Sequence, residues 1–365
     1  MIPASRLLQL FGYAVRAKRL LGRAAAQSSQ VKINRSRFYE DVWREAADKL
    51  GAVVGVEGGE ILKIALDGSA IRVHNNYTPL DDPVTQEVAL DKLLVHQILR
   101  SHGLPTPDHA EFSLNSLTRA CQFLARHQRC VVKPADGSAG GGGVTTGIET
   151  RRQFIKAAAR AAGYSSRLLV EEQVPGDVVR LLYLEGQLLD AVRRGPPMVI
   201  GDGQSRISQL VYGLNQKRIE AGYALAQVTL KYDMDMERTL AQQGLSWRSA
   251  PAMGRRVKLK TVINDNTADD NESVVDQLSV SVVNAGRRAA ELVGVKLAGV
   301  DVVTPDISQG LEESGGKILE VNTAPGYHYH YFKRDGACRV AIPILKTCLE
   351  QAHGRRFAEN QYAKI

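Results

Sequence analysis

The chain has 365 residues, with 47 Lys and Arg against 39 Asp and Glu, and a formal net charge of +8. Residues 1–39 contain eight basic residues and precede the first acidic residue, Glu40, so the rest of the chain is balanced at 39 charges of each sign. A nucleic-acid-binding protein is expected to carry its excess charge on the folded body, which argues against nucleic acid as a partner. A hydrophobic fraction of 44% excludes a mainly disordered chain, and no run of about 18 apolar residues predicts a transmembrane segment.

The basic segment 1–39 has apolar residues at roughly helical spacing, with Arg and Lys between them. This pattern predicts an amphipathic helix that docks on the body, on a second subunit, or on a membrane surface or partner protein. A targeting peptide is the remaining alternative. The four cysteines form no C-x-x-C pair, which indicates reduced thiols, and we therefore expect a cytoplasmic protein.

Apolar periodicity and turn residues predict the elements in chain order. A helix over 37–51 and three short strands between 53 and 73 form a first α/β unit that ends near residue 85. The following predictions are helices over 90–102 and 116–127, a strand over 129–134, a helix over 151–164, a strand over 168–174, and paired strands over 178–184 and 187–192. The last ones are helices after Ser205 and Asp233, an extended run over 257–263, a helix over 273–293, strands over 297–304 and 317–322, and a helix over 340–353. Strands and helices alternate without a strict βαβ rhythm, so the predicted class is α+β with several lobes.

The glycine-rich stretch 137–143 follows the predicted strand that ends at Lys133 and Pro134. Glycines let backbone N–H groups close around an anion, so a lysine before such a stretch predicts a phosphate-binding loop. It matches neither the P-loop nor the Rossmann pattern, because the lysine precedes the glycines. A flexible linker would have the same composition and is the alternative interpretation.

A second polar group lies near the other end of the chain. Glu320 and Asn322 are two residues apart in a predicted strand and therefore point to the same face. Asp301 lies on a strand that could pair with it. Three oxygen donors without His or Cys suit Mg²⁺, although solvated polar residues at strand ends would give the same pattern.

Together, these motifs resemble the ATP-grasp superfamily, and within it the ATP-grasp portion of cyanophycin synthetase, followed by the glutathione-synthetase half of bifunctional glutathione enzymes. The stretches that carry the resemblance are Leu90-Asp91-Lys92, 131–144, 169–176, Gly201-Asp202-Gly203, 298–308 and 320–326. The resemblance implies an ATP-grasp fold of three lobes, with ATP held between two α+β lobes. We expect a basic helical segment at 1–39, an N-terminal lobe at 40–88, a central lobe at 89–172, a C-terminal lobe at 173–353 and a tail at 354–365.

The resemblance also implies that ATP phosphorylates a carboxylate and that an amine then attacks the acyl phosphate, which gives an amide, ADP and phosphate. The implied partners are an amino acid or peptide carboxylate and an amine, the implied cofactors are ATP and one or two Mg²⁺ ions, which Mn²⁺ can replace, and a homodimer is common. An ATP-grasp protein that acts as a kinase or only binds nucleotide is the alternative. Because cyanophycin synthetase has a second half and this chain ends at Ile365, we do not expect a polymerase of that kind.

The resemblance assigns four groups of site residues. The ATP-binding residues are Lys92, Lys133, Gly137, Ser138, Gly140, Gly141, Gly142, Glu171, Glu172, Val174 and Asp177. The metal ligands are Asp301, Glu320 and Asn322, and the residues that contact substrate are Arg180, His328 and His330. Arg194 and Lys260 are the catalytic candidates, which hold the carboxylate and the acyl phosphate unless they are surface cations.

Three departures from the family pattern bear on the substrates. Relatives carry an acidic residue at the position of Val178, and the neighbouring Asp177 is the expected replacement for a contact with ribose. The segment 260–266 lacks paired glycines that help to hold the acyl phosphate in relatives, so a different carboxylate substrate is expected. The aromatic and His cluster 327–331 either lines the substrate entrance or packs in the interior.

Overall fold

The computed structural model describes residues 29–136, 142–220, 229–261 and 268–362. The predicted helix in the first 28 residues and the predicted contacts of Gly137, Ser138, Gly140 and Gly141 lie outside this part of the chain. The helices are α2 (Ser29–Leu50), α3 (Pro83–Leu90), α4 (Lys92–Ser101), α5 (Thr118–Arg126), α6 (Arg151–Ala161), α7 (Ile207–Glu220), α8 (Met234–Gln242), α9 (Val280–Val293), α10 (Leu311–Ser314), α11 (His328–Tyr331) and α12 (Ala341–Tyr362). The strands are β1 (Val53–Gly58), β2 (Ile61–Leu66), β3 (Ser69–His74), β4 (His109–Phe112), β5 (Cys130–Pro134), β6 (Thr145–Ile148), β7 (Leu168–Glu172), β8 (Asp177–Leu184), β9 (Gln187–Arg194), β10 (Met198–Ile200), β11 (Arg256–Lys258), β12 (Asn271–Ser273), β13 (Leu297–Thr304) and β14 (Lys317–Thr323).

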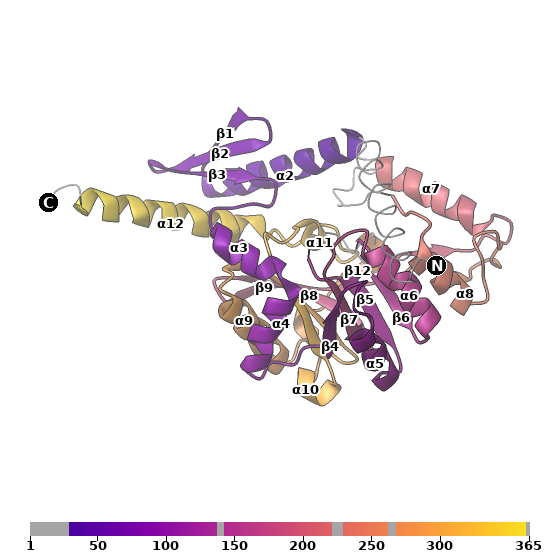
Figure 1. Cartoon of the computed structure of the whole chain (residues 1–365). Helices are drawn as coiled ribbons and strands as arrows, with labels where there is room; N and C mark the ends of the chain where they lie inside the picture. Colours follow the sequence, from indigo (N-terminus) through magenta and orange to yellow (C-terminus); the bar gives the residue numbers. More distant parts are fainter. Residues whose placement is uncertain (1–28, 137–141, 221–228, 262–267, 363–365) are drawn as a thin grey trace.

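The N-terminal strands form an antiparallel three-stranded sheet in the order β1-β2-β3. Alternation along β2 buries Leu62 and Ile64 and leaves Lys63 exposed, so the sheet has one apolar face. That face packs with α2 and α12 in one hydrophobic cluster. Figure 1 shows α2 and α12 beside this sheet, although they come from opposite ends of the chain.

The central lobe is an antiparallel four-stranded sheet in the order β4-β7-β5-β6, covered by α5 and α6. Helix α6 begins at a capping box, in which the Thr150 hydroxyl accepts a hydrogen bond from the Gln153 backbone and the Gln153 side chain accepts one from the Thr150 backbone. Phe112 and Phe154 meet in its core with ring centroids 5.2 Å apart. The strand that carries Lys133 is an interior strand of this sheet.

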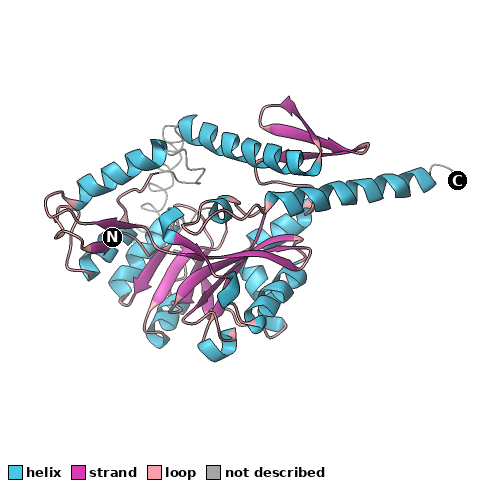
Figure 2. Cartoon of the chain, turned by 180° about the vertical axis from the view of Figure 1, so that it is seen from behind, coloured by secondary structure: helices cyan, strands magenta, loops and turns pink. Residues whose placement is uncertain are grey.

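The C-terminal part contains a five-stranded antiparallel sheet in the order β12-β9-β8-β13-β14. Helices α4 and α9 bury one of its faces in an apolar cluster, and Leu182, Leu184 and Leu297 on the other face pack with α2, α11 and α12. Figure 2 shows the sheet from behind, between these helices. Strands β10 and β11 and helices α7 and α8 form a further small unit with its own apolar cluster.

Several predicted elements have different bounds in the structure. The predicted helix over 90–102 is preceded by α3, and the two helices break at Asp91, whose side chain accepts hydrogen bonds from the backbone N–H groups of Leu93 and Leu94. The predicted helix over 273–293 begins only at Val280, because the strand β12 and a 3₁₀ turn come first. Helix α12 continues to Tyr362, so residues 354–362 are helical. No helix in the described ranges combines the length and apolar character that crossing a membrane requires.

Candidate functional site

One face of the five-stranded sheet carries charged side chains on adjacent strands. Arg180 on β8 is the register partner of Asp301 on β13, and Asp301 is the register partner of Glu320 on β14. On β9, Arg194 pairs with Val178, which lies two residues from Arg180 and therefore on the same face. Strand pairing thus brings together four residues that are far apart in the sequence.

A β-bulge in β14 turns Glu320 toward this face. Val302 pairs with Ile318 and Asp301 pairs with Glu320, so Leu319 is an extra residue without a partner on β13. Ile318 is fully buried on the opposite face against the cluster around α9. Simple alternation from Ile318 would place Glu320 on that apolar face, and the bulge is what aligns Glu320 with Asp301.

Asp301 is buried beneath two guanidinium groups. Arg180 donates from Nε to Oδ1 at 2.5 Å and from Nη2 to Oδ2 at 2.8 Å, and the distance from Arg194 Nη1 to Oδ2 is 3.7 Å. Burial raises the pKa of Asp301 above its ordinary value, although Arg180 acts in the opposite direction. Buried cations of this kind are suited to hold an anionic group.

Glu320 is more open than Asp301, with 32% of its side chain exposed against 5%. The distance from Lys92 Nζ to its Oε2 is 4.0 Å, and Asn322 donates a hydrogen bond to its Oε1 at 3.3 Å. Burial alone would raise the pKa of Glu320, but Lys92, a hydrogen bond with Asp301 and the charge of Lys133 lower it to about 2. Glu320 therefore carries a negative charge at neutral pH.

The donor set of Asp301, Glu320 and Asn322 fits Mg²⁺, which prefers carboxylate and amide oxygens and completes its shell with water or phosphate. Within the described residues, no group of three His, Cys, Asp or Glu side chains is placed to hold a metal alone. Both oxygens of Asp301 already accept hydrogen bonds from Arg180. Glu320 is consequently the carboxylate that offers the more accessible oxygen to a cation.

Lys133 lies on β5 with its Nζ 2.7 Å from Oε1 of Glu171 on the neighbouring strand β7. Glu171 is 3% exposed, so its side chain points into the lobe. The Oε1 atom of Glu172 accepts a hydrogen bond from the backbone N–H of Asp108 at 2.9 Å. Both carboxylates of the predicted hinge thus have partners within the protein, and an adenine contact there would rest on backbone groups near the half-buried Val174.

Helix α11 places its His and Tyr side chains over β9. Arg194 donates to the Tyr329 hydroxyl at 2.7 Å, and its Cζ lies 3.9 Å from the centre of the Tyr329 ring. His330 Nδ1 lies 2.8 Å from Oδ2 of Asp190. Tyr327 and Tyr331 belong to the apolar cluster, so the segment 327–331 both packs in the interior and contacts a predicted catalytic residue.

His328 is buried, and neither of its ring nitrogens has a hydrogen-bond partner among the described residues. Burial, together with the charges of Arg194 and Arg35, holds the pKa of His328 well below its ordinary value. The ring is therefore neutral at pH 7. A neutral imidazole without a partner can donate one hydrogen bond and accept another from a ligand.

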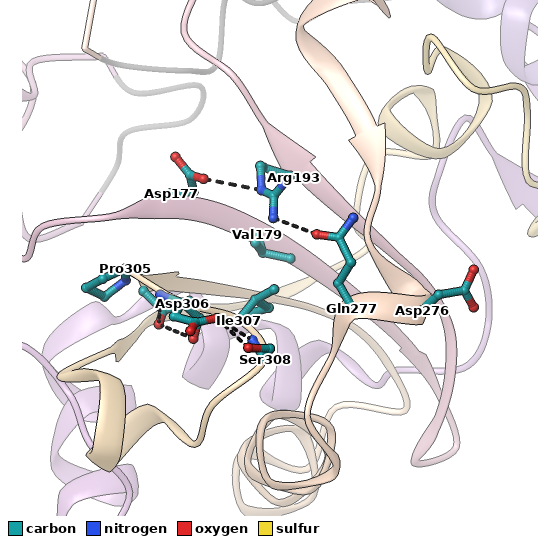
Figure 3. A pocket seen from close by; sticks show the side chains of 10 residues that line it. Asp177, Val179, Arg193, Asp276, Gln277, Pro305, Asp306, Ile307 and Ser308 are labelled. Atoms are coloured by element: carbon teal, nitrogen blue, oxygen red, sulfur yellow. Dashed lines mark hydrogen bonds and ion pairs between the residues drawn. The ribbon is translucent and has the colours of Figure 1, made fainter.

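The strand geometry places Asp177, the predicted ribose contact, on the face away from Arg180. Asp177 lies three residues before Arg180, so its side chain points to the opposite face of β8. There it lies 3.3 Å from Arg193 Nε, beside a cavity of about 400 Å³ that Asp276 and Asp306 also line. Figure 3 shows this arrangement. Val178, the departure from the family pattern, is the residue that shares the face of Arg180.

The structure places Lys260 in another unit than Arg194. Its Nζ lies 3.0 Å from Oδ2 of Asp233, the N-cap residue of α8, next to the small cluster of β10, β11, α7 and α8. The following residue, Thr261, bonds to Asp235 on the same helix. The described contacts therefore give Lys260 a structural partner, whereas Arg194 lies on the charged sheet face.

Gly142 is the predicted loop glycine that the structure describes. A Cβ atom built at this position would lie 2.6 Å from Cε1 of Tyr164. A larger residue here would displace the Tyr164 ring, so close packing gives a reason for this glycine independently of any phosphate.

Two residues beside the site, His96 and Asp190, were not predicted, and Tyr329 was predicted only as a member of the cluster 327–331. His96 follows Lys92 by one helical turn, so helix periodicity could have placed it on the same side of α4. Asp190 lies four residues before Arg194, and strand alternation could have placed it on the same face. The contact of Tyr329 with Arg194 depends on how α11 lies over β9, which no local pattern shows.

Comparison with known proteins relates the chain to ligases. No family model matches the sequence. The chain is 27% identical over 349 residues to a cyanophycin synthetase of Trichormus variabilis, which covers 88% of this chain and 38% of that protein. It is 28% identical over 266 residues to the glutathione biosynthesis bifunctional protein of Clostridium perfringens, with 72% of this chain and 34% of that protein covered.

A cyanophycin synthetase of Crocosphaera subtropica is 31% identical over 264 residues, which cover 71% of this chain and 30% of that protein. The chain thus spans less than two fifths of the length of these relatives. The crystal structure of a bifunctional glutathione synthetase from Pasteurella multocida superposes with a TM-score of 0.54 at 22% identity, and covers 84% of this chain and 44% of that one. This chain is therefore a homologue of cyanophycin synthetase and of the bifunctional glutathione enzymes, with the α+β ATP-grasp fold that the sequence predicted.

Proposed function

We propose that the chain is an ATP-dependent ligase that activates a carboxylate as an acyl phosphate and joins it to an amine, with ADP and phosphate as the other products. The observation that carries this proposal is the charged sheet face on which Arg180, Arg194, Asp301 and Glu320 meet beside Lys92. The relatives named above are ligases, which supports the same conclusion. The substrates that fit best are an amino acid or peptide carboxylate and a small amine.

In this proposal, Lys92 and Lys133 hold the phosphates of ATP, and Glu320 and Asn322 hold Mg²⁺ together with Asp301. When bound, Mg²⁺ would neutralise charge on the phosphoryl group that is transferred. Arg194 and Arg180 would bind the carboxylate and then the acyl phosphate, because fixed cations in a buried site stabilise charge without reorganisation. This reaction requires no protein nucleophile, and the sheet supplies positioning and charge.

The activity is tested by incubating the full chain with ATP, Mg²⁺ and pools of amino acids and short peptides. We expect phosphate release only when both a carboxylate and an amine are present, and a condensed product by mass spectrometry. Lys133→Ala should remove the activity, whereas Lys63→Ala, which changes an exposed lysine of the N-terminal lobe, should not. A stable phosphorylated carboxylate that persists with an amine present would show a kinase instead.

The proposal extends to where the protein is located and how it assembles. The four cysteines are free thiols, which suits the reducing cytoplasm. A homodimer is the assembly that we propose from the family resemblance, and sedimentation of the purified chain would measure it.

A further inference from the structure

His96 connects the elements that carry the predicted phosphate and metal residues. It lies on α4 with no exposed surface, and its Nε2 is 2.9 Å from the carbonyl oxygen of Leu319. Leu319 is the extra residue of the β-bulge in β14. A bulge leaves backbone groups of its extra residue outside the strand ladder, so a side-chain donor is what satisfies this carbonyl.

The other side of the ring faces the central lobe. His96 Nδ1 lies 3.4 Å from Nδ1 of His109 on β4 and 3.8 Å from Oε1 of Glu171 on β7. The same Glu171 oxygen is 2.7 Å from Lys133 Nζ. His96 therefore lies between the residue that precedes Glu320 and the ion pair that contains Lys133.

The bond to Leu319 fixes the tautomer of His96. A carbonyl oxygen only accepts, so Nε2 must carry the proton and donate it. Burial lowers the pKa of His96 to about 4, with Glu171 acting in the opposite direction and Lys133 in the same direction. Because a neutral ring with its proton on Nε2 has none on Nδ1, it does not compete with Lys133 for the Glu171 carboxylate.

We propose that His96 is a positioning residue of the ligase, which holds the bulge at Leu319 in the geometry that turns Glu320 toward Asp301. The inference rests on the proposed function, because it assigns Glu320 to Mg²⁺. Lys92, which lies one turn earlier on α4, approaches Glu320 on the same side. Helix α4 thus carries both Lys92, which faces Glu320, and His96, which donates to the strand of Glu320.

The test measures Mg²⁺ binding by calorimetry in the presence of a saturating, non-hydrolysable ATP analogue. His96→Leu replaces the imidazole with an apolar side chain of similar size that has no donor for Leu319. We expect the dissociation constant for Mg²⁺ to rise about 10-fold or more, as for other residues that orient a metal ligand. His96→Gln retains an N–H donor at similar reach and should restore binding to within about threefold of wild type.

Tyr183→Phe is the matched control. The Tyr183 hydroxyl is also buried and donates to a backbone carbonyl, that of Val283, at 2.8 Å, but Tyr183 lies on the sheet face opposite to Asp301 and Glu320. It should leave Mg²⁺ binding unchanged. The inference would be overturned if His96→Leu bound Mg²⁺ as tightly as the wild type, or if Tyr183→Phe lost as much Mg²⁺ affinity as His96→Leu. If the wild-type chain did not bind the nucleotide, that result would count against the proposed function itself.

A measurement on the wild-type chain keeps the inference testable if His96→Leu does not fold. Nitrogen NMR of ¹⁵N-histidine-labelled protein, assigned with His96→Gln, distinguishes the two neutral tautomers of a ring. We expect the His96 signal of a neutral ring protonated at Nε2. A neutral ring protonated at Nδ1 would leave Nε2 without a proton and would contradict the bond to Leu319.

Discussion

At the scale of single residues, Glu320 keeps its charge because of the cations around it. Its pKa is lowered to about 2 from 4.5, against the effect of burial, by Lys92, by a hydrogen bond with Asp301 and by Lys133. A lowered pKa in the folded state means that the charged form stabilises the fold above about pH 4.5. This contribution is lost as the pH falls from 4.5 through 2.

We therefore expect carboxyl ¹³C NMR to show that Glu320 titrates near pH 2, and Lys92→Ala to raise this pKa. Lys63→Ala, in the N-terminal lobe, is the control and should leave it unchanged. An unaltered Glu320 titration in Lys92→Ala would mean that Lys92 does not face this carboxylate in solution.

At the scale of elements, α2 supports α11 through aromatic rings. The Phe38 ring lies 5.7 Å from Tyr331 in an edge arrangement and 5.2 Å from Phe332. The Tyr39 hydroxyl accepts a hydrogen bond from the backbone N–H of Tyr327 at 3.3 Å. Because α11 carries His328 and Tyr329, the packing of α2 reaches the proposed carboxylate site.

Phe38→Ala should loosen α11 and raise the KM for the carboxylate substrate more than the KM for ATP. Each aromatic contact contributes about 0.5–1.5 kcal/mol beyond its buried area, so the loss of these two contacts alone should lower the stability by about 1–3 kcal/mol. Phe123→Ala is a matched control, because this half-buried ring stacks on His127 in the central lobe. Equal changes in the two KM values would show that α2 acts on the whole protein and not through α11.

The elements also show how far local sequence patterns reach. The strand over 297–304 and the helix after Asp233 were predicted closely, because an apolar run and an N-cap residue are local signals. The bulge at Leu319 depends on how β14 pairs with β13, and that register is set by a partner strand outside the segment. The face on which Asp177 lies follows from its odd spacing to Arg180, and its contact with ribose stays a prediction.

At the scale of the whole molecule, the predicted boundary at residue 39 falls inside a helix. The basic excess lies in residues 1–39, and the part of it that the structure describes belongs to α2. Arg35 donates to the Asn76 side chain at 2.7 Å, and Asn76 in turn donates to the carbonyl of Ala324, just before α11. The end of the basic segment is thus part of the folded body, and docking elsewhere remains a prediction for residues 1–28.

Two truncations separate these roles. A chain without residues 2–28 keeps every contact of α2 that the structure describes, so we expect it to retain ATP turnover and nearly the same melting temperature. A chain without residues 2–39 also loses Phe38 and Tyr39, and Tyr39 is 2% exposed. Removing large buried aromatic side chains costs about 3–5 kcal/mol, which corresponds to a fall of roughly 4–7 °C for a chain of this size.

The test compares calorimetric melting curves and ATP turnover of the two truncations with those of the full chain. An unchanged melting temperature after removal of residues 2–39 would show that α2 does not stabilise the body, contrary to its packing against α11 and α12. Loss of ATP binding in a folded chain that lacks only residues 2–28 would instead place part of the nucleotide site in the first 28 residues. If the chain that lacks residues 2–28 retained ATP turnover but changed from dimer to monomer in sedimentation, these residues would serve assembly. The charge-balanced body would then suffice for the reaction.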